Sequence, residues 1–320
     1  MKKVLILFGG NSFEHDISCM SVNFVKNNID TNLFDFEVVG IDKSNNWYIV
    51  DKKNNIDNNW IENSKDKIKN IIEYIKQFDI VFPVIHGNTC EDGKLQSLFE
   101  LYNIKYVGCN SYSSLICYDK LLTKLILEKY GIPQVPYIIY NKNLDLNNIK
   151  FPVIVKPCKC GSSIGISIAN NLEELLKSID IAKKYDENIL IEKYLVEKRE
   201  LECAILETKG KIIVSDIGEI MTKDFWYDFD SKYKTKINTN ISNINQNIKQ
   251  EIQKHSKNIF KILKCKNLSR IDFFFDIKEK KLYFNEINTI PGFTEISMYP
   301  KLINNLGINS KEMLTLLLES

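Results

Sequence analysis

Short apolar runs alternate with amphipathic stretches through the first third of the chain, and this alternation restricts the fold more than any other feature. The run at residues 3–8 ends at Gly9 and Gly10, as a strand buried on both faces would. Further strands are expected at residues 36–41, 47–50, 80–85 and 106–108, and helices at 18–28, 68–77 and 93–102. Strands that alternate with helices predict a parallel sheet with both faces covered, an α/β arrangement. The polar stretch at 51–70 is predicted to be a surface loop leading into a helix.

The alternation ends near residue 115, after which strands and helices follow one another in mixed order. A helix at 118–130 is expected to stop at Gly131-Ile132-Pro133. Two more helices are expected at 171–184 and 244–263, and strands at 151–156, 164–169, 188–192, 200–206, 212–220, 268–276 and 281–288. This mixture predicts an α+β region after the α/β region. A chain of 320 residues suits about two domains of roughly 150 residues.

Charge and cysteine content exclude several classes of protein. The chain has 43 Lys and Arg against 41 Asp and Glu, without the basic excess of a general nucleic-acid or membrane-surface binder. No apolar run approaches the roughly 20 residues needed to span a bilayer, and the run after Met1-Lys2-Lys3 is too short for a signal peptide. The eight cysteines lack the paired spacings of a zinc site. In a chain this long they indicate reduced thiols in a cytoplasmic protein.

Three oxygen-bearing side chains near the C-terminal end are the strongest chemical signal. Glu286 and Asn288 stand two apart in a predicted strand and therefore share a face. If the preceding predicted strand pairs with it, Asp272 lies beside them with Arg270 close by. These oxygens suit Mg²⁺, and an arginine there suits a transferring phosphoryl group. The alternative is a solvated edge with an accidental acid cluster; the turn at 291–294 weakens it, since its N–H groups could hold an oxyanion.

A loop of small residues at 156–165 separates two predicted strands and begins with Lys156. Glycine and serine let a backbone close over phosphate groups, to which a lysine can pair. The loop lacks the GxxxxGK[ST] pattern of a Walker loop, which runs from strand to helix. A plain glycine-rich hairpin turn explains the same residues equally well.

Weaker signals lie elsewhere. Glu192 and Glu200 sit on predicted strands, where carboxylates could contact a ribose. Glu14 follows the first strand, at the end of the sheet where α/β proteins bind ligands, and could hold an amine. His86 ends a strand before a glycine-rich turn, and the aromatic, charged run at 226–233 is typical of an active-site lid. The GxGxxG pattern of a dinucleotide-dependent dehydrogenase is absent.

Taken together, these residues resemble the D-alanine–D-alanine ligase family of ATP-grasp enzymes over essentially the whole chain. One family signature resembles His86-Gly87 through Glu91-Asp92-Gly93-Lys94-Leu95-Gln96, and a second resembles Arg270-Ile271-Asp272 through Glu286-Ile287-Asn288-Thr289-Ile290-Pro291-Gly292. Each piece is weak alone, but their joint occurrence is highly specific. The resemblance implies an ATP-grasp fold with an N-terminal substrate-binding α/β domain at 1–115, a central subdomain at 116–196 and a catalytic subdomain at 197–320.

The resemblance also implies roles for single residues. Glu14 would bind the amine of the first D-alanine, with His86 near its carboxylate, and Ser297 would bind the carboxylate of the second. Ser162 would bridge Glu14 and Tyr233. Arg270 and the Gly292 N–H would steady the phosphoryl group and the tetrahedral intermediate. The implied ATP-binding residues are Lys120, Lys156, Ser163, Glu192, Lys193, Leu195, Glu200 and Lys232. Two Mg²⁺ ions, or Mn²⁺, would be held by Asp272, Glu286 and Asn288.

The implied reaction joins two D-alanine molecules with ATP, through an acylphosphate, for peptidoglycan precursor synthesis. The implied partners are D-alanine and ATP, without nucleic acid or membrane, and the implied assembly is a homodimer in the cytoplasm. Two alternatives stay open: a D-alanine–D-serine ligase of the same family, and a non-catalytic ATP-binding protein. The apolar Met298 favours D-alanine over D-serine, Tyr233 disfavours D-lactate, and the intact acid cluster disfavours a non-catalytic protein.

Overall fold

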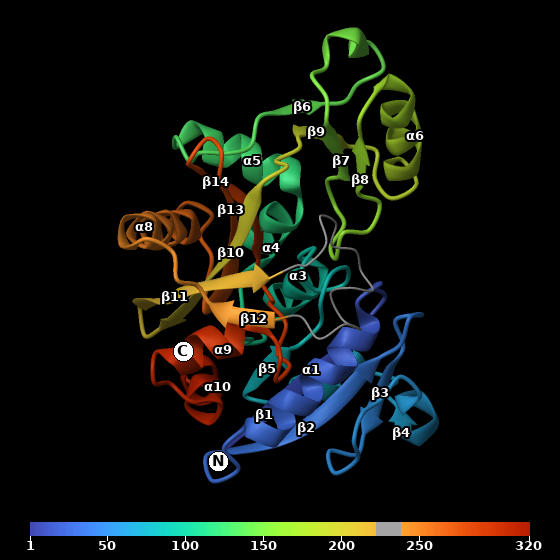
Figure 1. Ribbon diagram of the computed structural model, residues 1–320. Coiled ribbons are helices and arrows are strands. Elements are labelled where there is room, and N and C mark those ends of the chain that lie inside the picture. The colour runs from blue at the N-terminus through green and yellow to red at the C-terminus, as the bar shows by residue number, and fades with distance from the viewer. Residues whose placement is uncertain (222–237) are drawn as a thin grey trace.

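Three sheets organise residues 1–221 and 238–320, the part of the chain described by the computed structural model (Figure 1). The first has the order β4-β3-β2-β1-β5, from β1 (Lys2–Gly9), β2 (Phe34–Ile41), β3 (Trp47–Val50), β4 (Ser64–Lys67) and β5 (Ile80–Pro83). Strand β1 runs parallel to β2 and β5, which confirms the predicted parallel core. Strands β3 and β4 are antiparallel instead, because the few residues between β2 and β3 permit only a hairpin. The predicted strand at 106–108 is a single bridge between Val81 and Tyr106.

Alternate residues of β1 enter two separate cores, so the strand is buried on both faces as its sequence predicted. Ile6 belongs to a core with Val22 of α1 (His15–Asn28), and Leu7 to another with Phe99 of α3 (Lys94–Leu101). The second core also takes Ile75 from the short helix α2 (Ile71–Ile75). The expected strand–helix alternation is therefore confirmed for this region.

The polar stretch at 51–70 is mostly exposed and leads into α2, as predicted, but it is not loop throughout. It contains β4 and the 3-10 helix η1 (Trp60–Asn63), and Trp60 is buried. The indole packs edge-to-face on Phe8 with ring centroids 4.9 Å apart, and its N–H donates to His15 Nε2 at 3.1 Å. A Cβ on Gly40 would lie 2.4 Å from the indole, so a residue without a side chain makes room for it. One buried aromatic therefore anchors an otherwise polar segment.

The second sheet is antiparallel, with the order β6-β9-β7-β8, and carries the predicted glycine–serine hairpin. Its strands are β6 (Tyr137–Ile139), β7 (Val153–Pro157), β8 (Ser167–Ala169) and β9 (Ile189–Lys193), with α6 (Leu172–Ala182) packed beside them. The 3-10 helix η2 (Leu146–Asn148) precedes β7. The helix predicted at 118–130 is α5 (Lys120–Lys129), and α4 (Ser111–Tyr118) before it was missed. Asp119 separates the two and caps α5 by accepting from the Leu121 and Leu122 N–H groups.

The third sheet is also antiparallel, in the order β12-β11-β10-β13-β14. Its strands are β10 (Lys198–Thr208), β11 (Lys211–Met221), β12 (Asn238–Ile241), β13 (Leu268–Asp276) and β14 (Lys281–Asn288). Helix α8 (Gln246–Ile262) packs on one face, with Ile259 and Phe260 in a core with Ile271. On the other side, α9 (Met298–Asn305) and α10 (Ser310–Leu318) share the core that holds Ile6. The first and third sheets are therefore joined through common apolar packing. Along the described ranges, no helix combines the length and apolarity needed to cross a membrane.

Candidate active site

A cleft of about 530 Å³ gathers side chains from the first sheet, the hairpin of the second sheet and the third sheet. The predicted site residues that line it are Glu14, His86, Lys120, Ser162, Glu200, Arg270, Asp272, Glu286, Asn288, Gly292 and Ser297. Five other predicted residues do not line it: Lys156, Ser163, Glu192, Lys193 and Leu195. Lys232 and Tyr233 lie outside the described residues. Segments far apart in the sequence therefore meet around one hollow.

The register of the third sheet places acidic side chains in a row. Asp272 on β13 pairs with Glu286 on β14 and, on its other side, with Glu202 on β10. Directly paired residues of antiparallel strands point to the same face, so the three carboxylates are neighbours. Asn288 adds a bond from its Nδ2 to Asp272 Oδ2 at 3.1 Å. The predicted pairing of these two strands is confirmed.

Arg270 is fixed within this row by two carboxylates. Its Nε and Nη2 donate to the two oxygens of Asp272 at 2.8 and 2.7 Å, a bidentate fork, and Nε lies 3.2 Å from Glu202 Oε2. Burial alone would lower the pKa of Arg270, but Asp272 and Glu202 raise it well above its ordinary value. The guanidinium is therefore permanently charged and held in one orientation, as phosphate binding requires.

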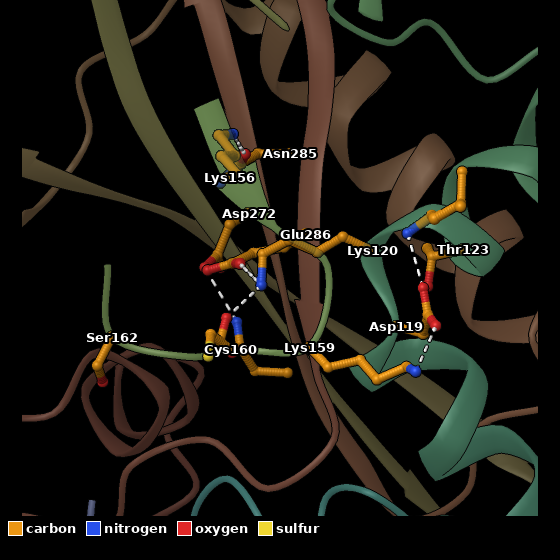
Figure 2. A network of polar contacts seen from close by, with 12 residues as sticks. Asp119, Lys120, Thr123, Lys156, Lys159, Cys160, Ser162, Asp272, Asn285 and Glu286 are labelled. Carbon is orange, nitrogen blue, oxygen red and sulfur yellow. Dashed lines mark hydrogen bonds and ion pairs between the residues drawn. The ribbon is translucent and has the colours of Figure 1, made fainter. Parts of the chain in front are cut away.

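Lys120 connects the acid row to the glycine–serine loop (Figure 2). Its Nζ donates to the Cys160 carbonyl at 2.6 Å and lies 3.6 Å from Glu286 Oε2. A backbone bond also joins the start of α5 to this loop, because the Lys120 N–H donates to the Cys158 carbonyl at 3.1 Å. The start of α5 thus places a cation between the acids and the loop.

The glycine–serine loop closes onto Glu14 at the start of α1. Ser162 Oγ donates to Glu14 Oε1 at 2.5 Å, although Glu14 follows a strand of the first sheet and Ser162 lies between two strands of the second. Ser162 and Ser163 both adopt the left-handed backbone, with φ of 52° and 61°. A Cβ on Gly161 would lie 2.8 Å from Glu14 Oε2. The carboxylate and the loop are therefore in direct contact.

A buried three-charge cluster lies beside the cleft. Glu192 on β9 is paired with Lys124 of α5 at 2.9 Å and with Lys156 of β7 at 2.7 Å. Burial would raise the pKa of Glu192, but the two lysines lower it to about 2. Lys156 also donates to Asn285 Oδ1 at 3.4 Å, next to Glu286 on β14 (Figure 2). Lys156 therefore reaches the third sheet without lining the cleft itself.

The remaining predicted nucleotide residues have ordinary protein partners. Lys193 is exposed and paired with Glu279, and Leu195 is buried in a small apolar cluster with Val135. Glu200 lies 3.2 Å from Lys198 at the cleft wall.

His86 and Glu91 both form hydrogen bonds to the backbone of Ile290. The His86 ring bonds to the Ile290 carbonyl through Nδ1 at 2.9 Å and to Ser21 Oγ through Nε2 at 2.9 Å. Glu91 accepts the Ile290 N–H at 3.1 Å and the Gly87 N–H at 2.8 Å. Burial lowers the pKa of His86, whereas burial and then the Glu14 charge raise that of Glu91 to about 8. Both side chains line the cleft.

The far end of the cleft is built from the turn before α9. Ser297 Oγ accepts the Thr294 N–H at 3.0 Å, and a Cβ on Gly292 would lie 2.8 Å from that oxygen. Met298 lines the cleft and fills the space beside Gly218 of β11, where a Cβ would lie 2.4 Å from its sulfur. This end therefore presents a hydroxyl next to an apolar wall.

Sequence reasoning assigned no role to Glu91, Glu202 or Lys124. Each has a signal that could have found it: Glu91 lies five residues after His86, Glu202 is two residues from Glu200 on the same strand, and Lys124 is one helical turn after Lys120. Their partners lie far along the chain, so only the folded structure identifies them.

Two family models match most of the chain. The one described as D-ala D-ala ligase N-terminus matches residues 3–109, and the one described as D-ala D-ala ligase C-terminus matches residues 126–319. Among curated relatives, the D-alanine–D-alanine ligase of Clostridium acetobutylicum is 38% identical, covering 99% of this chain and 97% of the relative. That of Ruminiclostridium cellulolyticum is 36% identical, covering 99% and 94%.

Solved structures resemble the whole chain as well. The VanG D-Ala:D-Ser ligase from Enterococcus faecalis superposes with a TM-score of 0.87 at 32% identity, covering 99% of this chain and 98% of that one. The D-alanine–D-alanine ligase from Bacillus anthracis complexed with ATP has a TM-score of 0.77 at 27% identity, covering 100% and 97%. The similarity therefore extends over complete chains.

Proposed function

The chain belongs to the D-alanine–D-alanine ligase family and is a ligase with the ATP-grasp fold, and we propose that it joins two D-alanine molecules for cell-wall synthesis, using ATP. The observation that carries this proposal is the cleft in which Glu14, Ser162, Arg270, Asp272 and Glu286 converge. Their chemistry supports a site that holds an amine at one end and phosphate groups at the other.

We assign the ATP phosphates to the cationic side of the cleft. Lys120 and Arg270 supply positive charge within the cleft and Lys156 supplies it from beside the cleft, and Ser163 belongs to the glycine–serine loop. Lys120 already bridges the loop and the acid row, which supports this assignment. By resemblance alone, we assign the binding of the adenosine part of ATP to Glu192, Lys193, Leu195 and Glu200. Lys232 is assigned to the phosphates on the same ground.

The acid row fits Mg²⁺ by the chemistry of its donors. Asp272 and Glu286 offer carboxylates and Asn288 an amide oxygen. The fork from Arg270 and the Asn288 amide both bond to Asp272, so protein groups fix the position of this carboxylate. The set therefore suits an ion that completes its shell with phosphate oxygens and water, as Mg²⁺ does and Mn²⁺ can. We propose two such ions; when bound, they neutralise phosphate charge.

The first step is phosphoryl transfer from ATP to the carboxylate of the first D-alanine, giving an acylphosphate and ADP. Glu14 holds the amine of that D-alanine and so aims its carboxylate across the cleft. Arg270 and Lys120 offset the charge of the moving phosphoryl group, since such transfers depend mainly on alignment and charge neutralisation. The Ser162–Glu14 bond keeps the loop closed, which excludes water from the acylphosphate.

The second step is attack of the amine of the second D-alanine on the acylphosphate carbonyl, after which phosphate leaves. The N–H of Gly292 and the Arg270 guanidinium donate to the oxyanion of the tetrahedral intermediate. Ser297 holds the carboxylate of the incoming D-alanine, near Gly292. The products are D-alanyl-D-alanine, ADP and phosphate.

D-Serine is the competing second substrate, because a D-Ala:D-Ser ligase is among the similar structures. Met298 supports D-alanine instead. Its thioether lines the cleft beside Ser297, and a D-serine hydroxyl placed against it would lose hydrogen bonds to water without a replacement. A non-catalytic ATP-binding protein is disfavoured by the complete set of cations and acids.

We also propose a homodimer in the cytoplasm. Exposed apolar side chains on α3 and α4, including Leu101, Tyr112 and Leu115, support a contact between copies. All eight cysteines are free thiols, which supports a reducing compartment.

The experiment that tests the function is phosphate release from Mg·ATP with D-alanine alone, with the product identified by mass. D-Serine, D-lactate and L-alanine run in parallel, and Asp272→Asn is the inactive control. D-Alanyl-D-alanine from D-alanine alone supports the proposal. Turnover only after D-serine is added would transfer the protein to the D-serine type, and no turnover with any substrate would overturn the ligase mechanism.

A further inference from the structure

Three side chains from the N-terminal region hold the backbone of residues 290–293. Glu91 accepts the Ile290 N–H and His86 bonds to the Ile290 carbonyl, so both backbone groups of one residue are held. Ser21 Oγ accepts the Phe293 N–H at 3.2 Å. The residues in each of these pairs are about 200 or more positions apart.

The hydrogen bonds fix the tautomer of His86. A carbonyl oxygen only accepts, so His86 Nδ1 carries the proton that faces Ile290. Nε2 is then an acceptor and receives the Ser21 hydroxyl proton. Both ring nitrogens are thereby engaged by protein groups, and His86 holds the backbone at Ile290 in its neutral form.

Glu91 is the central link, because its carboxylate joins two loops. One oxygen accepts from Gly87 and the other from Ile290. A glutamine cannot replace it: its amide has one acceptor oxygen, and its NH₂ group would face an N–H group. Aspartate has a shorter side chain, so it would lose the hydrogen bond to at least one of the two loops.

Holding a carboxylate here costs free energy, since burial and the Glu14 charge both raise the pKa of Glu91. A neutral acceptor would link two loops without that cost. The N–H groups of Gly87 and Ile290 act in the opposite sense and favour the ionised form, because each donates to one carboxylate oxygen. Ile290 lies two residues before Gly292. The free-energy cost of burying this carboxylate is explained if the reaction depends on the position of the Gly292 N–H.

We propose that Glu91 is a positioning residue that sets the location of the Gly292 N–H relative to the acylphosphate. The proposal rests on the proposed function, in which Gly292 donates to the oxyanion. Such a donor must lie about 2.7–3.1 Å from the oxyanion, so a small shift of the 290–293 backbone removes its effect. Glu91 touches neither substrate nor metal in this role; it acts through Ile290.

The test compares Glu91→Gln with Asp92→Asn, which removes a charge from the same turn but has no bond to residues 290–293. The readouts are kcat, KM for ATP, melting temperature, and hydrogen–deuterium exchange of the peptide containing Ile290. For Glu91→Gln we expect kcat to fall about 10- to 100-fold, with KM for ATP within about twofold, an unchanged melting temperature and faster exchange. Asp92→Asn is expected to match the wild type in all four.

Three results would overturn the proposal: an unchanged kcat in Glu91→Gln, a loss of activity that follows a lowered melting temperature, or an equal loss in Asp92→Asn. Should Glu91→Gln fail to fold, Ser21→Ala removes the bond to the Phe293 N–H at the other end of residues 290–293. This variant is expected to lower kcat with the same selectivity. Failure of the proposed function has a separate signature, because the wild type itself would then release no D-alanine-dependent phosphate.

Discussion

Asp272 and Glu286 are direct partners across β13 and β14, so the spacing of the acid row is set by strand register and not by loops. A slip of one residue would turn every side chain of β14 to the opposite face. Glu286 and Asn288 would then leave the cleft together. The hydrogen bonds along two strands therefore hold the proposed metal ligands in place.

Glu286→Gln is expected to reduce phosphate release by more than about a hundredfold, since changes even in outer partners of metal sites cost about 10- to 100-fold. The side chain keeps its size, so the melting temperature is expected to stay within a few degrees. The measurement is turnover across a magnesium titration, in which the variant requires more Mg²⁺ than the wild type. Glu251→Gln on α8 serves as the control. Equal magnesium requirements in Glu286→Gln and wild type would contradict the ligand assignment.

Ser162→Ala is expected to uncouple ATP use from ligation. Without its hydroxyl, the loop loses its bond to Glu14, and water gains access to the acylphosphate. We expect the ratio of phosphate released to dipeptide formed to rise above one, with kcat for the dipeptide reduced about tenfold. Ser167→Ala, in the same hairpin, is the matched control. A ratio that remains at one would mean that the loop closes without this bond.

Glu192 is expected to contribute stability that disappears in acid. Its carboxyl has a pKa of about 2 in the folded protein and an ordinary value of 4.5. The unfolded chain therefore takes up the proton first as the pH falls, and the contribution, about 3 kcal/mol, is present above pH 4.5 and lost between 4.5 and 2. Urea unfolding of the wild type and Glu192→Gln, measured from pH 6 to pH 3, isolates this effect. A stability difference that stays constant over that range would count against it.

Trp60→Ala is expected to destabilise the first sheet by about 3–5 kcal/mol, because a large aromatic would leave a cavity beside Phe8. Gly40→Ala would place a methyl group against the Trp60 indole and is expected to destabilise the protein by about 1–3 kcal/mol through overpacking. Denaturant unfolding measures both. Ile61→Ala, at an exposed neighbouring residue, is the control and is expected to change stability little. A small effect of Trp60→Ala would mean that this segment adds little to the core.

Sequence periodicity was sufficient to predict the parts of the site in which the spacing of residues within one strand or hairpin decides which side chains lie together. The spacing of two between Glu286 and Asn288 predicted their common face, and the hairpin at 268–288 was confirmed with Asp272 opposite Glu286. The glycine–serine loop was correctly placed between two strands. In each case the information was local, within a strand or between two adjacent strands.

Prediction failed where a distant contact decided the outcome. The segment at 51–70 looks polar, and only the packing of Trp60 on Phe8 makes it ordered structure. Helix α4 was missed because Asn110, its cap, lies in a stretch without clear periodicity. The roles of Glu91 and Glu202 depend on Ile290 and Arg270, which lie 199 and 68 positions away.

The attachment of residues 290–293 to the N-terminal region limits how relatives can be recombined in the laboratory. A chimera that takes its first part from one parent and its last part from another divides Glu91 from Ile290 and Ser21 from Phe293. Such hybrids should succeed when both parents present compatible groups at these four positions. Crossovers chosen only by sheet boundaries would produce proteins that fold yet ligate slowly.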